Sequence, residues 1–166
     1  MKIFGLVGWS GSGKTTLLVS LLPELVGRGI TVSTVKHTHH NVDVDKPGKD
    51  SYRHRNAGAT EVVLLSSSGW TIMHPLRGAP EPTTEELMTR LTPVDLLLVE
   101  GFKKHPHDKL EVHRPALGKP LLCRDDPTIV AVASDGPAET RSIPILSLND
   151  VTAVADFIVG HCRLVE

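Results

Sequence analysis

The chain has 166 residues, 40% of them hydrophobic, which predicts a single nucleotide-binding domain over residues 1–166 with a substantial core. Its formal net charge of −1 argues against partners such as nucleic acid or an anionic membrane. No apolar stretch reaches the roughly 20 residues that span a bilayer, and glycine interrupts the first apolar run, so we expect a cytoplasmic protein. The two cysteines fit no CxxC pattern, and we expect both thiols to be reduced.

The first third of the chain has the pattern of a strand, a helix and a second strand. Residues 3–7 form a short apolar run, typical of a buried strand. Apolar residues then recur with helical spacing up to Gly27 and Gly29, which predicts a helix with a kink at Pro23. Residues 30–35 alternate and are rich in β-branched side chains, which predicts the second strand.

The middle of the chain has shorter and more polar patterns. Residues 50–59 resemble a short polar helix, and residues 61–65 and 69–73 are predicted to form a hairpin around a serine-rich turn. Thr83 or Thr84, followed by Glu86, begins an apolar stripe up to residue 91 in the manner of a capping box.

The last part of the chain contains four strand patterns and a helix. Residues 94–99 are almost wholly apolar, as in a central parallel strand, whereas residues 110–113 are expected at a sheet edge. Residues 128–133 and 143–146 follow as further strands, and Asn149 or Asp150 begins the final helix. This order predicts an α/β fold of the P-loop NTPase type, a mostly parallel sheet flanked by helices, with a β-hairpin extension.

Residues 8–15, GWSGSGKT, match the phosphate-loop pattern GxxxxGK[ST] at every fixed position. Glycines let the backbone curve closely around phosphates, and the following helix adds its N-terminal positive charge. The alternative is a glycine-rich turn that binds nothing. The expected nucleotide contacts are Gly8, Trp9, Ser10, Gly11, Ser12, Gly13, Lys14, Thr15 and Thr16.

Three further groups complete the predicted nucleotide site. The Lys14 ammonium can reach the β- and γ-phosphates, the Thr15 hydroxyl can bind Mg²⁺, and Thr16 is expected at the α-phosphate. Glu100 ends the apolar strand, where the carboxylate on the magnesium side of such sites lies, and would reach the metal through a water. The alternative for Glu100 is a solvated carboxylate at the strand end.

Asp135 is the candidate for recognition of the base. It follows the strand pattern TIVAVAS, and a carboxylate can accept both N1–H and N2–H of guanine. No NKxD motif of the G-protein type is present in the sequence. The alternative is a turn or helix-capping aspartate before Gly136 and Pro137.

With these motifs placed, the chain resembles the molybdopterin-guanine dinucleotide biosynthesis adaptor family, MobB. The resemblance covers most of the chain and is weakest over residues 103–126. The segments that carry it are GWSGSGKTTLL, the block KHTHH-VDVDKPGKDSYRHRNAGA, DLLLVEGFK, and IVAVASD with LNDV-ADFIV.

The resemblance implies several properties. Members of this family bind GTP with Mg²⁺, hydrolyse it slowly at best, and form homodimers. They are thought to assist the partner guanylyltransferase that attaches GMP to molybdopterin. On this basis residues 8–16 would hold the phosphates, Glu100 would lie on the magnesium side, and residues 36–50 would lie beside the nucleotide.

Residues 36–50, KHTHHNVDVDKPGKD, allow three interpretations. His37, His39 and His40 with the following aspartates could bind a transition metal, but their spacing on an extended segment places His40 on the opposite side from the other two. A solvated loop is the second interpretation. The favoured one is a switch-like loop, in which Asp43 or Asp45 would bind magnesium-coordinated water or position the attacking water.

Two other functions use the same phosphate loop. A small-molecule kinase would need an arginine-rich lid, for which only Arg53 and Arg55 are suggestive. A metal-insertion NTPase would depend on the histidine cluster. For the homodimer, strands at residues 69–73 or 110–113 are the candidates for pairing between two copies.

Overall fold

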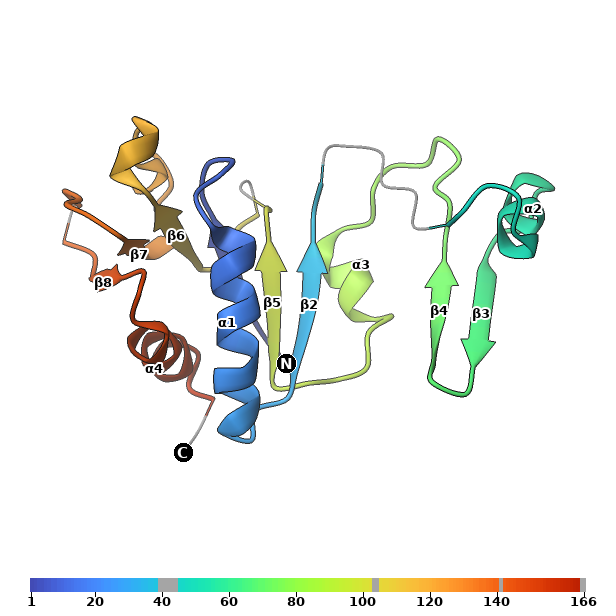
Figure 1. Ribbon diagram of the computed structural model, residues 1–166, viewed down its shortest axis with the longest axis horizontal. Coiled ribbons are helices and arrows are strands. Elements are labelled where there is room, and N and C mark those ends of the chain that lie inside the picture. The colour runs from blue at the N-terminus through green and yellow to red at the C-terminus, as the bar shows by residue number, and fades with distance from the viewer. Residues whose placement is uncertain (39–44, 103–104, 141, 165–166) are drawn as a thin grey trace. The chain divides into compact units, whose positions relative to one another are not determined.

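The computed structural model describes residues 1–38, 45–102, 105–140 and 142–164 (Figure 1). Two compact units make up the chain. The first comprises Met1–Thr38 with Thr92–Glu166, and the second comprises His39–Leu91. The first holds a six-stranded sheet and the second a two-stranded one.

The sheet of the first unit is parallel at every pairing between its strands. The strand order is β2-β5-β1-β6-β7-β8 (Figure 1). The strands are β1 (Lys2–Val7), β2 (Val32–Lys36), β5 (Leu96–Glu100), β6 (Lys109–His113), β7 (Ile129–Ser134) and β8 (Ile145–Ser147). The expectation of a mostly parallel α/β sheet is confirmed.

Two helices, α1 (Lys14–Gly27) and α4 (Val151–Cys162), pack against each other and share one apolar core with the sheet. Leu21, Leu25 and Ile158 are fully buried in that core, because the helical spacing of these residues places them on one stripe. Pro23 lies inside α1, as predicted. The core fixes the start of α1 at the end of β1, where the phosphate-loop motif lies.

The sequence prediction for residues 110–113 was wrong, because β6 lies inside the sheet, paired with both β1 and β7. The alternating charges of KLEVH resemble the solvated face of an edge strand, yet Lys109 and Glu111 are fully buried. The Glu111 carboxylate accepts hydrogen bonds from the backbone N–H groups of Leu122 at 2.8 Å and Cys123 at 2.9 Å. These donors belong to a short 3₁₀ turn, Leu122–Arg124; a second such turn is Pro115–Leu117.

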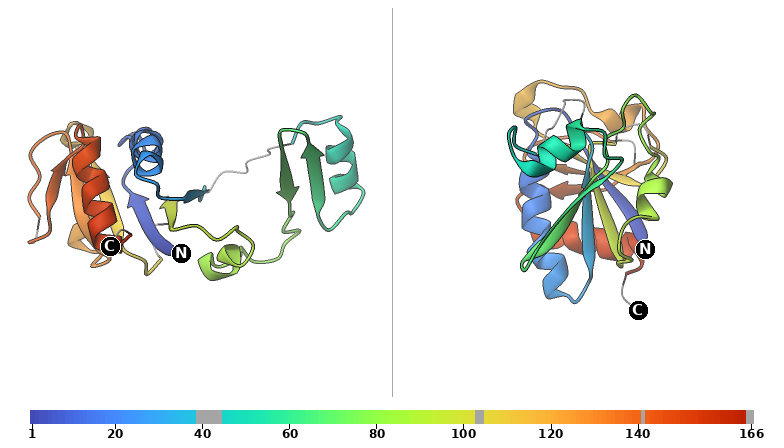
Figure 2. Two further views of the ribbon diagram at one scale, coloured as in Figure 1. Left: turned by 90° about the horizontal axis from the view of Figure 1, so that it is seen from below. Right: turned by 90° about the vertical axis from the view of Figure 1, so that its right-hand side faces the viewer.

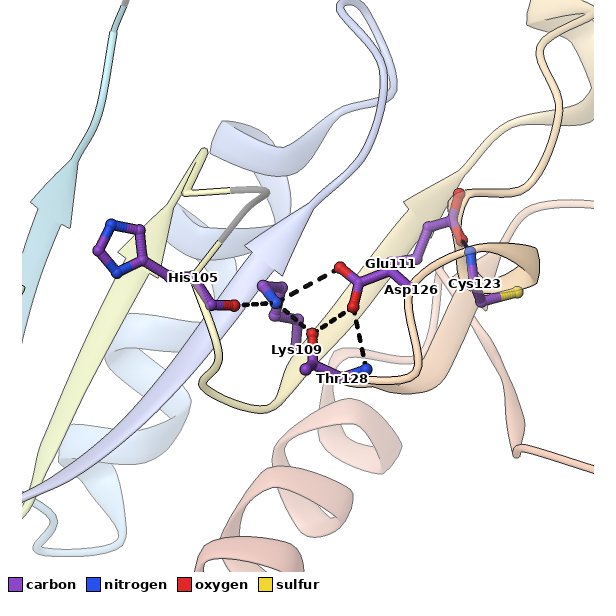
Figure 3. Close-up of polar contacts among 6 residues, drawn as sticks. All are labelled: His105, Lys109, Glu111, Cys123, Asp126 and Thr128. Atoms are coloured by element: carbon purple, nitrogen blue, oxygen red, sulfur yellow. Dashed lines mark hydrogen bonds and ion pairs between the residues drawn. The ribbon is translucent and has the colours of Figure 1, made fainter.

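The ammonium of Lys109 has its own set of oxygen partners (Figure 3). It donates to the His105 carbonyl at 2.5 Å and to the Thr128 hydroxyl, and forms an ion pair with Asp126 at 3.4 Å. The neighbouring His107 is half-buried, and its pKa is lowered to about 4 by burial first and then by the positive charges of Lys109 and His105. Partners from distant loops therefore allow a charged strand face to be buried.

The second unit contains the predicted hairpin, β3 (Val62–Ser66) and β4 (Gly69–Met73), which pair antiparallel. It also contains α2 (Asp50–Asn56), which packs beside β3 (Figure 2), and α3 (Thr84–Met88). The predicted capping box is confirmed, because Thr83 Oγ1 accepts from the Glu86 N–H and the Glu86 carboxylate accepts from the Thr83 N–H. None of the helices in the described ranges has the length and apolar character needed to cross a bilayer.

Candidate functional site

The phosphate-loop motif forms the turn between β1 and α1. Gly11 and Gly13 have φ angles of 79° and 94°, in the left-handed region that favours glycine. Gly8 is required for a second reason, because a Cβ at this position would lie 2.4 Å from the Val112 carbonyl oxygen. The loop thus passes close to β6, and a larger residue at position 8 would displace it.

Lys14 is directed back over the loop that precedes it. Its Nζ donates to the carbonyl oxygens of Gly8 at 3.1 Å and Trp9 at 2.9 Å. The Trp9 indole N–H in turn donates to the Pro120 carbonyl at 2.8 Å. The loop therefore carries a fixed positive charge, and its tip is fastened to the segment that follows β6.

Thr15 and Glu100 come together at the end of the central strands. The Thr15 hydroxyl donates to the Glu100 carboxylate at 2.8 Å, and the Glu100 side chain is largely buried. Their meeting follows from the register, since Glu100 pairs with Leu6 of β1 and with Lys36 of β2. A hydroxyl and a carboxylate are hard oxygen ligands of the kind that Mg²⁺ prefers.

Lys36 gives a direct indication that this place suits a cation. Its ammonium lies 3.5 Å from the Glu100 carboxylate and 3.4 Å from the Thr15 hydroxyl oxygen. The ammonium thus stands in for a positive ion next to the two predicted ligands. The residues present therefore fit Mg²⁺.

Arg114 also lies at this site, although the residues predicted from the sequence did not include it. Its Nε donates to the Ser12 carbonyl at 3.0 Å, and its Nη1 forms an ion pair with Asp135. The Arg114 guanidinium thus links Asp135 to the phosphate loop, and a role of Asp135 in reading the base stays a prediction. The available signal was positional, because Arg114 directly follows β6 and lies at the same sheet edge as the loop.

The histidine and aspartate block is only partly described. His39, His40 and Asp43 lie outside the described residues, so the metal and switch interpretations of them are untested. The His37 ring lies 4.6 Å from the Phe102 ring, and its backbone N–H donates to the Glu100 carbonyl. Within the described ranges, no three His, Cys, Asp or Glu side chains form a group that could hold a metal ion.

Asp45 belongs to the second unit and is largely buried there. One carboxylate oxygen accepts from the Ser51 hydroxyl and from the Lys46 N–H, both at 2.9 Å. These bonds connect the segment before α2 to the first turn of that helix. A role for Asp45 in hydrolysis stays a prediction.

The chain is similar to known proteins over most of its length. Residues 3–135 match the family model described as "MobB: Molybdopterin guanine dinucleotide synthesis protein B". Molybdopterin-guanine dinucleotide biosynthesis adapter proteins of Haemophilus influenzae and Escherichia coli are 43% and 42% identical, over 95% and 96% of this chain and 88% and 92% of theirs.

Solved structures agree with this result. The crystal structure titled molybdopterin-guanine biosynthesis protein B superposes with a TM-score of 0.75 at 27% identity, covering 96% of this chain and 99% of that chain. Together with the family match over most of the chain, this confirms both the P-loop NTPase fold and the resemblance stated from the sequence. The chain belongs to the molybdopterin guanine dinucleotide synthesis protein B (MobB) family.

Proposed function

We propose that this chain is a GTP-binding adapter in the biosynthesis of molybdopterin guanine dinucleotide. In this proposal it acts in the cytoplasm, binds GTP with Mg²⁺, hydrolyses GTP slowly, and assists a partner guanylyltransferase. The binding of GTP and Mg²⁺ is supported mainly by the hydrogen bond from the Thr15 hydroxyl to the Glu100 carboxylate, next to the residue whose ammonium lies over the loop, Lys14. The adapter part is supported by the names of the two relatives above 40% identity.

Each group of the site has a defined task in this proposal. Lys14 contacts the β- and γ-phosphates, Thr16 contacts the α-phosphate, and Thr15 with Glu100 holds Mg²⁺. The metal supplies positive charge that neutralises the phosphate oxygens. Asp43 and Asp45 stay candidates for positioning the attacking water, and Asp135 for reading the base.

The adapter role is tested by adding the purified chain to a molybdopterin guanylyltransferase and measuring the transfer of GMP. We expect faster formation of the dinucleotide with the wild-type chain than without it. Co-purification of the two proteins would add support. Identical progress curves with and without the chain, together with no co-purification, would contradict the adapter role.

Glu100→Gln should remove the dependence of GTP affinity on Mg²⁺, because the amide is uncharged and a much weaker ligand for this ion. By calorimetry, Mg²⁺ should tighten GTP binding to the wild type by about tenfold or more, a difference of about 1.4 kcal/mol. In the variant, affinities with and without Mg²⁺ should agree. Asp95→Asn is the matched control and should keep the response, because Asp95 immediately precedes β5, at the end opposite Glu100.

The proposed homodimer is supported by one face of the hairpin. Four apolar side chains lie on that face, each at least 48% exposed, in two cross-strand pairs: Val63 with Ile72 and Leu65 with Trp70. On the opposite face, Val62 and Met73 are buried. A two-stranded sheet is marginally stable in water, and a contiguous apolar face of this kind is typical of an interaction surface.

Leu65→Asp should therefore shift a dimer to a monomer, because it places an unpaired charge in the buried face of the interface. Sedimentation velocity at matched concentrations measures the change. Leu64→Asp is the matched control, since its side chain lies on the other face of the same strand. If both variants sediment as the wild type does, this face of the hairpin is not the dimer surface.

A further inference from the structure

A hollow of about 250 Å³ lies directly beside the phosphate loop. It shares Gly13 and Thr16 with the loop and is also lined by residues that follow β6 and β8. In open α/β sheets, ligands bind at the carboxyl ends of the strands. A nucleotide held by the loop would therefore have room next to its phosphates on this side.

The hollow combines an apolar floor with a polar rim. Leu17 and Leu148 are at least 93% buried and provide the floor, whereas Ser20 and Asn149 are exposed at the rim. The side-chain amide of Asn149 makes no hydrogen bond to any residue within the described ranges. Flat aromatic rings with polar edges suit such a site, which is the character of a nucleobase.

Arg114 contributes the charged wall of the hollow. Two of its nitrogens are engaged, Nε with the Ser12 carbonyl and Nη1 with Asp135. The third, Nη2, makes no hydrogen bond to a described residue and lies beside Gly13, where an added Cβ would be 3.3 Å away. A guanidinium N–H pairs with the O6 and N7 acceptors of guanine, whereas adenine presents a competing N6 amino donor.

Asp135 holds this guanidinium in place rather than facing the hollow, of which it is not a lining residue. Pro115 and Gly136, which directly follow Arg114 and Asp135, also lie close together. A Cβ added at Gly136 would be only 3.2 Å from the Pro115 ring. The ends of β6 and β7 are thus fastened together around the ion pair. Arg114 is therefore pre-organised, which lowers the entropic cost of binding a planar ligand.

We propose that the hollow receives the base of the bound guanine nucleotide, that Arg114 reads the O6 and N7 edge, and that Asp135 is a positioning residue for Arg114. The inference rests on the proposed function and makes it more specific. It also differs from the direct role for Asp135 that the sequence suggested.

The test compares three probes by calorimetry: Mg²⁺-GTP, Mg²⁺-ATP and Mg²⁺-tripolyphosphate, which lacks a base. Ser20→Trp fills the hollow from the exposed side of α1 without changing the phosphate loop. We expect its GTP affinity to fall about tenfold or more, toward that of tripolyphosphate, while tripolyphosphate affinity stays within about twofold of the wild-type value. Val19→Trp, an equally bulky change at a 60% exposed position outside the hollow, should bind all three probes like the wild type.

Arg114→Gln separates the two roles of the ion pair. If Arg114 reads the base, this variant loses the preference for GTP over ATP, and Asp135→Asn loses less of it. The proposal would be overturned if Arg114→Gln kept the full preference for GTP over ATP while Asp135→Asn lost it completely. Unchanged GTP affinity in Ser20→Trp would also overturn it. A wild-type chain that binds tripolyphosphate but does not prefer GTP overturns only the base site, whereas one that binds none of the probes overturns the proposed function itself.

Discussion

Lys14→Ala is expected to weaken the binding of GTP to this chain by at least about tenfold. The Nζ of Lys14 lies within 3.1 Å of two carbonyl oxygens of the loop, so its charge is held where phosphates would enter. Its removal takes away the one side-chain cation that the loop itself contributes within the motif, while the backbone N–H groups and the helix N-terminus remain. A charge-assisted contact of this kind contributes about 1.5–3 kcal/mol or more, a factor of at least about tenfold in affinity.

Calorimetric titration with Mg²⁺-GTP measures this effect, with urea denaturation to show that the variant is folded. Lys2→Ala is the matched control, because Lys2 is an exposed lysine at the opposite end of β1 from the phosphate loop. A folded Lys14→Ala protein with wild-type GTP affinity would show that the loop is not the nucleotide site.

Lys109→Ala is expected to produce a large loss of stability. The side chain is fully buried, and truncation leaves the His105 carbonyl, the Thr128 hydroxyl and Asp126 without their common donor. Breaking a buried ion pair by removing one partner costs about 3–5 kcal/mol. Because Asp126 remains partly exposed, we place the loss of unfolding free energy at the lower end, about 3 kcal/mol.

Urea denaturation of Lys109→Ala and Lys109→Met separates charge from packing, because methionine keeps most of the buried chain without the ammonium. The Met variant should lose less stability than the Ala variant. A second readout is the pKa of His107, which should rise from about 4 in both variants, since the Lys109 charge is one cause of its depression. An unfolding free energy within about 0.5 kcal/mol of the wild-type value, which is the usual effect of a surface substitution, would contradict the structural role of Lys109.

Much of the fold and of the phosphate site follows from local sequence patterns. Glycine spacing and the Lys-Thr pair define the loop, and an apolar run that ends in Glu100 places a carboxylate at the correct sheet edge. Both inferences follow from the rule that the carboxyl ends of parallel strands lie at the same edge of the sheet. The bounds of most strands followed from the same apolar runs.

The parts that could not be predicted depend on contacts between distant segments. Lys109 and Glu111 are tolerated inside the sheet only because Thr128, Asp126 and the turn at Leu122–Arg124 supply partners from later in the chain. The link from Asp135 through Arg114 to the loop likewise joins three segments. Only its position directly after a predicted strand distinguishes Arg114 from the other arginines, and that position does not reveal its partners.

Binding of GTP with Mg²⁺ at the phosphate loop is tested most directly by calorimetric titration of the wild-type chain with GTP and ATP, each with and without Mg²⁺. We predict saturable binding of GTP that is tighter with Mg²⁺ and tighter than that of ATP. No binding of GTP, or preferential binding of ATP with rapid turnover on addition of a small acceptor, would contradict the claim and favour a kinase instead.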